Sequence, residues 1–271
     1  VEQDLADHID LNFGCPVPKV TRRGGGGVLP WKRDRLASIL TKTVQAADAY
    51  GVPVTMKTRM GIDDDHLTYL DAGRIAEQAG VAAIALHART VAQAYSGQAR
   101  WETIGQLAAS VTIPVLGNGD IWEASDALAM MDRTGCAGVV IGRGCLGRPW
   151  LFGDLADAFA GREPRPLPTL GEVASMVRRH AELLAELHGE RWGLTDLRKH
   201  MAWYLHGVRG ACGPFNFLPS AGRVRRPNPG PADSKETPRA CPSFTVTCCP
   251  RLMPHAAPAA AGASQPVRST C

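Results

Sequence analysis

Short runs of β-branched and apolar residues alternate along the first half of the chain with longer segments in which apolar residues recur every three or four positions. Runs of the first kind indicate strands buried on both faces, and segments of the second kind indicate amphipathic helices. The predicted strands cover residues 8–13, 52–57, 82–87, 113–118 and 138–142, and the predicted helices cover 34–49, 68–80, 100–110 and 123–134. This repeat predicts an α/β fold built on a parallel sheet.

A repeating βα chain folds either as a doubly wound sheet or as a (βα)8 barrel. The doubly wound dinucleotide-binding fold would place GxGxxG directly after the first strand, whereas the glycines at 24–27 follow a ten-residue loop and lack that spacing. A barrel instead collects its reactive side chains at the carboxyl ends of its strands. Six such side chains follow the predicted strands: Cys15, Lys57, His87, Asn118, Asp120 and Arg143. We therefore expect a partial (βα)8 barrel of the TIM type, made of five βα units.

Composition divides the chain into three parts. Residues 1–161 form the predicted partial barrel, and residues 170–206, after a Pro-rich break, form a small domain of two amphipathic helices separated near Gly193. Residues 207–271, called the tail below, carry 8 Lys and Arg against 2 Asp and Glu, together with 11 prolines and no helical or strand periodicity. Such a segment buries too little apolar surface to offset its ordering entropy. We expect a disordered tail, and its composition suggests a sequence encoded out of frame.

Charge, cysteines and hydropathy exclude several classes of protein. The net charge of +4 arises in the tail, so it does not by itself indicate a polyanionic partner. The eight cysteines lack the CxxC and His spacing of zinc sites, and we predict no metal. No apolar stretch approaches the roughly 18 residues of a membrane helix, and the acidic first ten residues differ from a signal peptide. We expect a cytoplasmic protein without membrane contact, and the missing initiator Met suggests a fragment or a misassigned start.

The segment 11–27, LNFGCPVPKVTRRGGGG, carries the most specific candidate chemistry. Cys15 lies just past a strand end, between a glycine and a proline, so its thiol could reach a substrate above the sheet. The alternative is a buried structural cysteine, which is common for free thiols. Three basic side chains in the same loop could meet phosphates or simply form a solvated face: Lys19, Arg22 and Arg23.

Five motifs occur in order along residues 1–206: NxGCPxxxV with a glycine cluster after it, TMKTR, HxRT, GNGDI and IGRGxxGxPWLF. Together with a later RKHxxWYL stretch, they resemble the tRNA-dihydrouridine synthase family, in particular its bacterial B branch. The resemblance implies a (βα)8 barrel that binds FMN and a C-terminal helical domain that binds tRNA. It implies that NADPH reduces the flavin, which then reduces a uridine in tRNA to 5,6-dihydrouridine. We expect a monomer with tRNA as its partner.

The same resemblance implies roles for individual residues. Cys15 is similar to the general acid that protonates C5 of the uracil while the flavin N5 delivers hydride to C6. Lys57 and His87 are similar to residues that contact the flavin, and a buried lysine is costly without an anionic partner. The implied phosphate site, which simple turn chemistry could also explain, consists of Asn118, Gly119, Asp120, Gly142 and Arg143. The implied tRNA contacts of the helical domain are Arg198, Lys199 and His200, although the aromatic residues beside them could be core.

The family resembled here begins with about three further βα units that this sequence does not contain. They include a Pro-Met-Ala flavin segment and a glutamine that contacts the flavin. We therefore expect the 271 residues alone to bind flavin weakly and to be an inefficient enzyme. Two other interpretations stay open at this point: another FMN barrel that reduces free pyrimidines, and an inactive remnant of the family that binds RNA.

Overall fold

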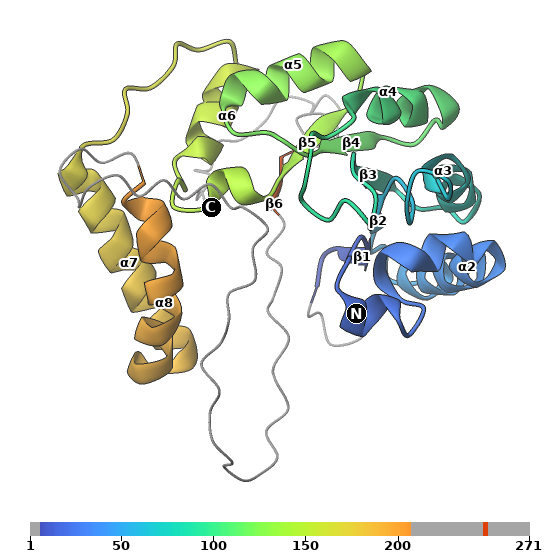
Figure 1. Ribbon diagram of the computed structural model, residues 1–271, viewed down its shortest axis with the longest axis horizontal. Helices are drawn as coiled ribbons and strands as arrows, with labels where there is room; N and C mark the ends of the chain where they lie inside the picture. Colours follow the sequence, from blue (N-terminus) through green and yellow to red (C-terminus); the bar gives the residue numbers. More distant parts are fainter. Residues whose placement is uncertain (1–5, 207–245, 249–271) are drawn as a thin grey trace, which may run out of the picture. The chain divides into compact units, whose positions relative to one another are not determined.

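The computed structural model describes residues 6–206 and the backbone of residues 246–248 (Figure 1). Five parallel strands alternate with helices, as the sequence predicts. The strands are β1 (Ile9–Phe13), β2 (Val54–Arg59), β3 (Ala83–His87), β4 (Val115–Asn118) and β5 (Gly138–Ile141). The helices between them are α2 (Arg33–Asp48), α3 (Tyr69–Gln78), α4 (Trp101–Ser110) and α5 (Ala124–Thr134). The βα repeat is confirmed, with each boundary within two residues of its predicted place.

The strands lie in the sheet in the order in which they occur in the chain, β1-β2-β3-β4-β5-β6. The short strand β6 (Val246–Cys248) belongs to the tail, for which the sequence predicted no strand. Its first two residues, Val246 and Thr247, are β-branched and favour extended backbone, and the edge of the sheet beside β5 offers them a pairing partner. The expected disorder of the rest of the tail concerns residues outside those that the structure describes.

The pairing register gives the sheet two different faces. Neighbours in register, such as Asn12, Lys57 and Ala85, share a face, whereas the next residue along each strand points to the other face. The face that carries Met56 and Ile84 is apolar and buried. Helices cover this face: a side chain at Gly117 would lie 2.4 Å from the Met130 sulfur of α5, and α2, α3 and α4 lie along the strands (Figure 1).

The other face, called the polar face below, carries the hydrophilic side chains of the strands. Its polar members are Asp10, Asn12, Thr55, Lys57, Arg59, His87 and Asn118, and the same face also carries a small buried apolar cluster of Ala85, Leu116 and Val140. Thr55 donates a hydrogen bond to Asp10 at 2.7 Å, and the ring of His8 lies 2.8 Å from the Thr55 hydroxyl. In a closed barrel this face would point inward.

The connections after β1 and β5 contain short helical turns. Helix α1 (Pro18–Thr21) and the 3-10 helix η1 (Gly26–Trp31) follow β1, and the 3-10 helix η2 (Arg143–Cys145) and helix α6 (Leu151–Phe159) follow β5.

The helical region consists of α7 (Leu170–His188) and α8 (Glu190–Tyr204). Helix α7 begins with a capping box in which Thr169 and Glu172 bind each other's backbone N–H groups. The predicted separation near Gly193 is wrong, because the chain turns at Gly189, where φ is +78°. Gly193 instead lies within α8 at a close helix contact: a side chain there would come within 2.6 Å of the Leu184 backbone.

By their internal contacts the described residues form two compact units, each considered by itself below. The first unit holds the chain up to Gly119 together with residues 129–140. The second holds residues 120–128 and, of the described residues after β5, residues 141–206 with α6, α7 and α8.

Candidate functional site

Three polar side chains form a row across the carboxyl ends of β2, β3 and β4. The register pairs Arg59 with His87 and His87 with Asn118, so all three lie on the polar face. Lys57 lies on the same face, two residues before Arg59. The sequence placed Lys57 at the end of its strand, but β2 continues through Arg59, because polar residues can also extend a strand whose one face is polar.

Lys57 is half-buried and makes no hydrogen bond or salt bridge with any residue that the structure describes. Burial lowers the pKa of its ammonium group from 10.5 to about 8. The positive charge of Arg59 lowers this pKa further, and the carboxylate of Asp10 opposes the shift. An anionic ligand on the polar face would therefore meet a cation that no group within residues 6–206 neutralises by direct contact.

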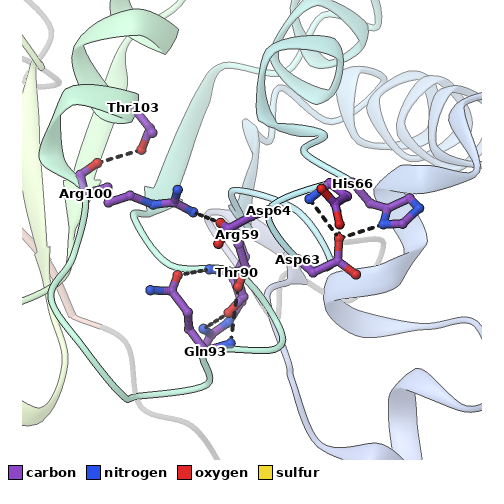
Figure 2. A network of polar contacts seen from close by, with 9 residues as sticks. Arg59, Asp63, Asp64, His66, Thr90, Gln93, Arg100 and Thr103 are labelled. Carbon is purple, nitrogen blue, oxygen red and sulfur yellow. Dashed lines mark hydrogen bonds and ion pairs between the residues drawn. The ribbon is translucent and has the colours of Figure 1, made fainter.

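Arg59 joins two loops at this end of the sheet. Its side chain is 2% exposed, and its Nε donates to the Gly14 carbonyl at 2.8 Å. Its Nη1 donates to the carbonyls of Thr90 and Ala94 at 2.9 and 2.8 Å, in the loop after β3 (Figure 2). Sequence reasoning missed this residue, although the strand period places it on the same face as Lys57.

Cys15 lies half-buried on the loop between β1 and α1, next to the carbonyl that Arg59 holds. Its own carbonyl accepts a hydrogen bond from the Gly27 N–H at 3.0 Å. The glycine cluster makes this fold-back possible, because a side chain at Gly26 would lie 2.5 Å from the Cys15 carbonyl oxygen. The thiol is therefore carried by a loop whose backbone is held from two sides.

His87 and Asn118 end neighbouring strands and are both buried. The Asn118 amide donates to the Val140 carbonyl at 2.7 Å, which joins β4 to β5. The Gly119 carbonyl accepts a hydrogen bond from the indole N–H of Trp101 at 2.9 Å. Trp101, at the start of α4, is a second residue that sequence reasoning missed, and it fixes the backbone directly after β4.

In the second unit, the remaining predicted phosphate residues lie on two loops that approach each other. An Arg143 guanidinium nitrogen lies 3.9 Å from an Asp120 carboxylate oxygen, and the guanidinium stacks over the Trp122 ring at 5.6 Å. Gly142 is exposed, and a side chain there would meet nothing within 4 Å. Backbone N–H groups beside an arginine can bind an anion, and Asp120 offsets part of the positive charge here.

The predicted tRNA-contacting residues have different surroundings. Lys19, Arg22 and Arg23 are exposed in and after α1, and Arg198 is exposed on α8. Lys199 donates to Asp196 at 2.6 Å. His200 instead points into the helical pair, where its ring lies 4.7 Å from that of His180 and 5.3 Å from that of Trp203.

Two features are absent from the described part of the chain. Within residues 6–206, no three His, Cys, Asp or Glu side chains gather closely enough to hold a metal ion. None of the helices in that range has the length and apolar character needed to cross a membrane.

Comparison with known proteins gives a consistent result. Residues 1–214 match the family model described as dihydrouridine synthase. A probable tRNA-dihydrouridine synthase of Mycobacterium leprae is 64% identical over 207 residues, which are 76% of this chain and 54% of that protein. A tRNA-dihydrouridine synthase B of Xanthomonas axonopodis pv. citri is 42% identical over 199 residues, 73% of this chain and 59% of that protein.

A probable tRNA-dihydrouridine synthase of Synechocystis is 41% identical over 206 residues, 76% of this chain and 57% of that protein. The chain thus spans little more than half the length of these relatives. The family model covers most of the chain, including all five βα units and the helical region, and the expected TIM-barrel class agrees with it. The chain therefore belongs to the dihydrouridine synthase family.

Proposed function

We propose that this chain carries the flavin-facing and uracil-facing part of a tRNA-dihydrouridine synthase. In this proposal FMN, reduced by NADPH, serves the reduction of a uridine in tRNA to 5,6-dihydrouridine. Lys57 is the single observation that carries the proposal: it is a cation on the polar face, its pKa is lowered to about 8, and none of the described residues forms a hydrogen bond or salt bridge with it. A site of this kind is suited to an anionic ring system.

The residues present fit a flavin mononucleotide. Lys57 would hold the side of the isoalloxazine ring that gains negative charge, and His87 would contact the ring from the next strand. We assign Asn118 and Gly119 of the first unit to FMN binding. In the second unit, Asp120, Gly142 and Arg143 are the residues that we assign to its phosphate, which backbone N–H groups and the guanidinium would bind. A bound, reduced flavin would supply the hydride that adds to C6 of the uracil.

Cys15 would act as the general acid. Addition of hydride at C6 leaves an electron pair that must be protonated at C5, and a thiol can donate that proton. Two hydrogen bonds to the Cys15 loop, from Arg59 and from the Gly27 N–H, hold the backbone that carries the thiol. Such fixed placement is what proton transfer requires, because the donor must lie within hydrogen-bond reach of the reacting carbon.

The proposal includes tRNA as the partner and a division of labour between domains. Residues 1–161 would form the FMN-binding part, and residues 170–206 would form part of the tRNA-binding domain. Exposed cations without a carboxylate partner, namely Lys19, Arg22, Arg23 and Arg198, would meet backbone phosphates. We propose a cytoplasmic monomer.

The test compares the 271 residues with the same chain preceded by the N-terminal part of the Mycobacterium leprae relative. We expect the extended protein to be yellow, to release FMN rather than FAD, and to form dihydrouridine in an unmodified tRNA transcript with NADPH. The 271 residues alone should bind flavin weakly, because the barrel wall formed by the preceding units is absent. An extended protein that reduces free pyrimidines but not tRNA would favour the other FMN barrel reductases, and one that binds RNA but no flavin would favour the inactive remnant.

A further inference from the structure

The loop after β3, residues 89–97, presents an aromatic ring beside the polar row. The Tyr95 side chain is 55% exposed, so packing against the core does not fix it. Its ring nevertheless lies 6.3 Å from the His87 ring, and the Arg59 guanidinium lies over it at 5.5 Å. The place of this ring is therefore set by these contacts together with the backbone that carries it.

Arg89, the first residue of this loop, closes the loop from inside. Its side chain is 1% exposed. Its Nε donates to the Ser96 carbonyl at 3.1 Å, and its Nη2 donates to the Gly97 carbonyl at 2.7 Å. A side chain at one end of the loop thus binds the backbone at the other end.

The residues on the two sides of Tyr95 are held by different guanidinium groups. Arg59 binds the Ala94 carbonyl on one side, and Arg89 binds the Ser96 carbonyl on the other. Ala94 has a φ of +50°, which is uncommon for a residue with a side chain. Such a conformation persists only where its surroundings hold it.

The rest of the loop is secured by its own contacts. The Thr90 N–H donates to the Gln93 side-chain oxygen at 2.9 Å, and the Gln93 N–H donates to the Thr90 hydroxyl at 3.2 Å (Figure 2). The Val91 N–H donates to the Gly61 carbonyl at 2.9 Å. These contacts fix the start of the loop. In the returning part, the N–H and the hydroxyl of Ser96 each donate to the Gln93 carbonyl at 2.8 Å, and Arg89 adds its two hydrogen bonds to the carbonyls of Ser96 and Gly97.

We propose that Arg89 is a positioning residue of the candidate site. Its guanidinium holds the returning backbone of the loop, so that the Tyr95 ring stands beside His87 as a fixed wall of the polar face. A buried guanidinium that binds backbone carbonyls can do this because its donors have a rigid, planar geometry, which a lysine lacks. That this wall borders a flavin and uracil site rests on the proposed function; the positioning itself does not.

The experiment uses the full chain labelled with 3-fluorotyrosine. Four tyrosines give four fluorine signals, and Tyr95→Phe identifies the signal of Tyr95. We compare the unsubstituted chain with Arg89→Lys and Arg89→Met, which keep an unbranched side chain but remove the guanidinium, and with Arg74→Lys on α3 as a control at an exposed arginine. We expect both Arg89 variants to move the Tyr95 signal toward that of free 3-fluorotyrosine. Amide exchange at residues 94–97 should rise by about tenfold or more, since two hydrogen bonds to this backbone are weakened or lost.

The control should leave the Tyr95 signal and the exchange unchanged. Unchanged values in a folded Arg89→Lys or Arg89→Met protein would overturn the proposal, and so would an equal effect on all four tyrosine signals, which would indicate general loosening. A second experiment tests the premise that this wall borders a flavin site. FMN is added to the unsubstituted chain preceded by the N-terminal part of the Mycobacterium leprae relative. If FMN leaves the Tyr95 signal unmoved, the site assignment fails, while the role of Arg89 is still judged by the first comparison.

Discussion

Replacement of Lys57 by Met should stabilise the protein and at the same time weaken its binding of anions. Lys57 lies within β2 on the polar face, half-buried and without a hydrogen-bond or salt-bridge partner among the described residues. Methionine has a similar length and no charge to bury. The substitution therefore removes a cost of folding and a binding group together.

The size of the stabilisation follows from the pKa of Lys57. One pKa unit corresponds to about 1.36 kcal/mol, so a native pKa of about 8 instead of 10.5 makes the charged form cost up to about 3 kcal/mol in the folded state. Because the native pKa is lowered, the unfolded chain binds more protons than the folded chain between about pH 8 and 10.5. This cost is fully present below pH 8 and disappears above 10.5.

Urea unfolding at several pH values measures this effect. At pH 7 we expect Lys57→Met to exceed the unsubstituted chain by about 2 to 3 kcal/mol in the free energy of unfolding. The difference should shrink steadily as the pH rises toward 10.5, and other titrating groups cancel in the comparison. Lys42→Met, at an exposed position of α2, is the matched control and should change stability little at any pH.

Lys57→Met should have the opposite effect on the stabilisation that FMN provides. FMN should raise the stability of the unsubstituted chain, extended as described above, more than that of its Lys57→Met form, since ligand binding stabilises only the form that holds it. A stability difference that does not depend on pH would refute the electrostatic argument. Equal stabilisation of both proteins by FMN would refute the role of Lys57 as its partner.

Three further outcomes follow from other parts of the molecule. Cys15→Ala should leave flavin binding and NADPH oxidation by the extended protein nearly intact and lower dihydrouridine formation roughly 10²- to 10⁴-fold, as product analysis of tRNA would show; unchanged product would make Cys15 structural. Gly193→Val should destabilise the helical pair by about 1 to 3 kcal/mol in thermal unfolding, because its side chain would meet the backbone of α7, whereas Gly171→Ala, at an open position of the same pair, should not. Burial lowers the pKa values of His180 and His200, so the helical pair of α7 and α8 should lose stability as the pH falls below the pKa of an ordinary imidazole. Circular dichroism measures this loss as a fall in helicity, and a helicity that stays constant from pH 8 to 5 would contradict the reasoning.

The sequence predicted the βα repeat well because parallel strands covered on one side by helices keep an apolar period that survives in the chain. Met56 and Ile84 belong to that period and lie on the helix-covered face. The end of β2 was predicted two residues too early, since Lys57, Thr58 and Arg59 look hydrophilic without the pairing that places two of them on the polar face. Periodicity detects the apolar face, and only the register identifies the other one.

Other misses have a different physical origin. Two glycines, Gly189 and Gly193, compete as the end of α7, and the choice depends on which of them must allow a close helix contact. The buried arginines at 59 and 89 look like surface charges in the sequence, because their partners are backbone carbonyls rather than carboxylates. Every residue has a backbone carbonyl, so such a partner cannot be recognised from the residue types of the loop.

The two faces of the sheet contribute differently to the stability of the protein. The apolar face of the sheet is buried against helices. The polar face instead carries charged and hydrophilic side chains at strand positions, namely Asp10, Asn12, Lys57 and Arg59. Arg59 is satisfied by loop carbonyls and therefore organises the site, but Lys57 is held without such a partner. A buried charge that lacks a direct partner among the described residues is typical of a site that binds a ligand during function. The pH dependence of Lys57→Met measures that remaining cost directly, at the place where the fold and the proposed chemistry meet.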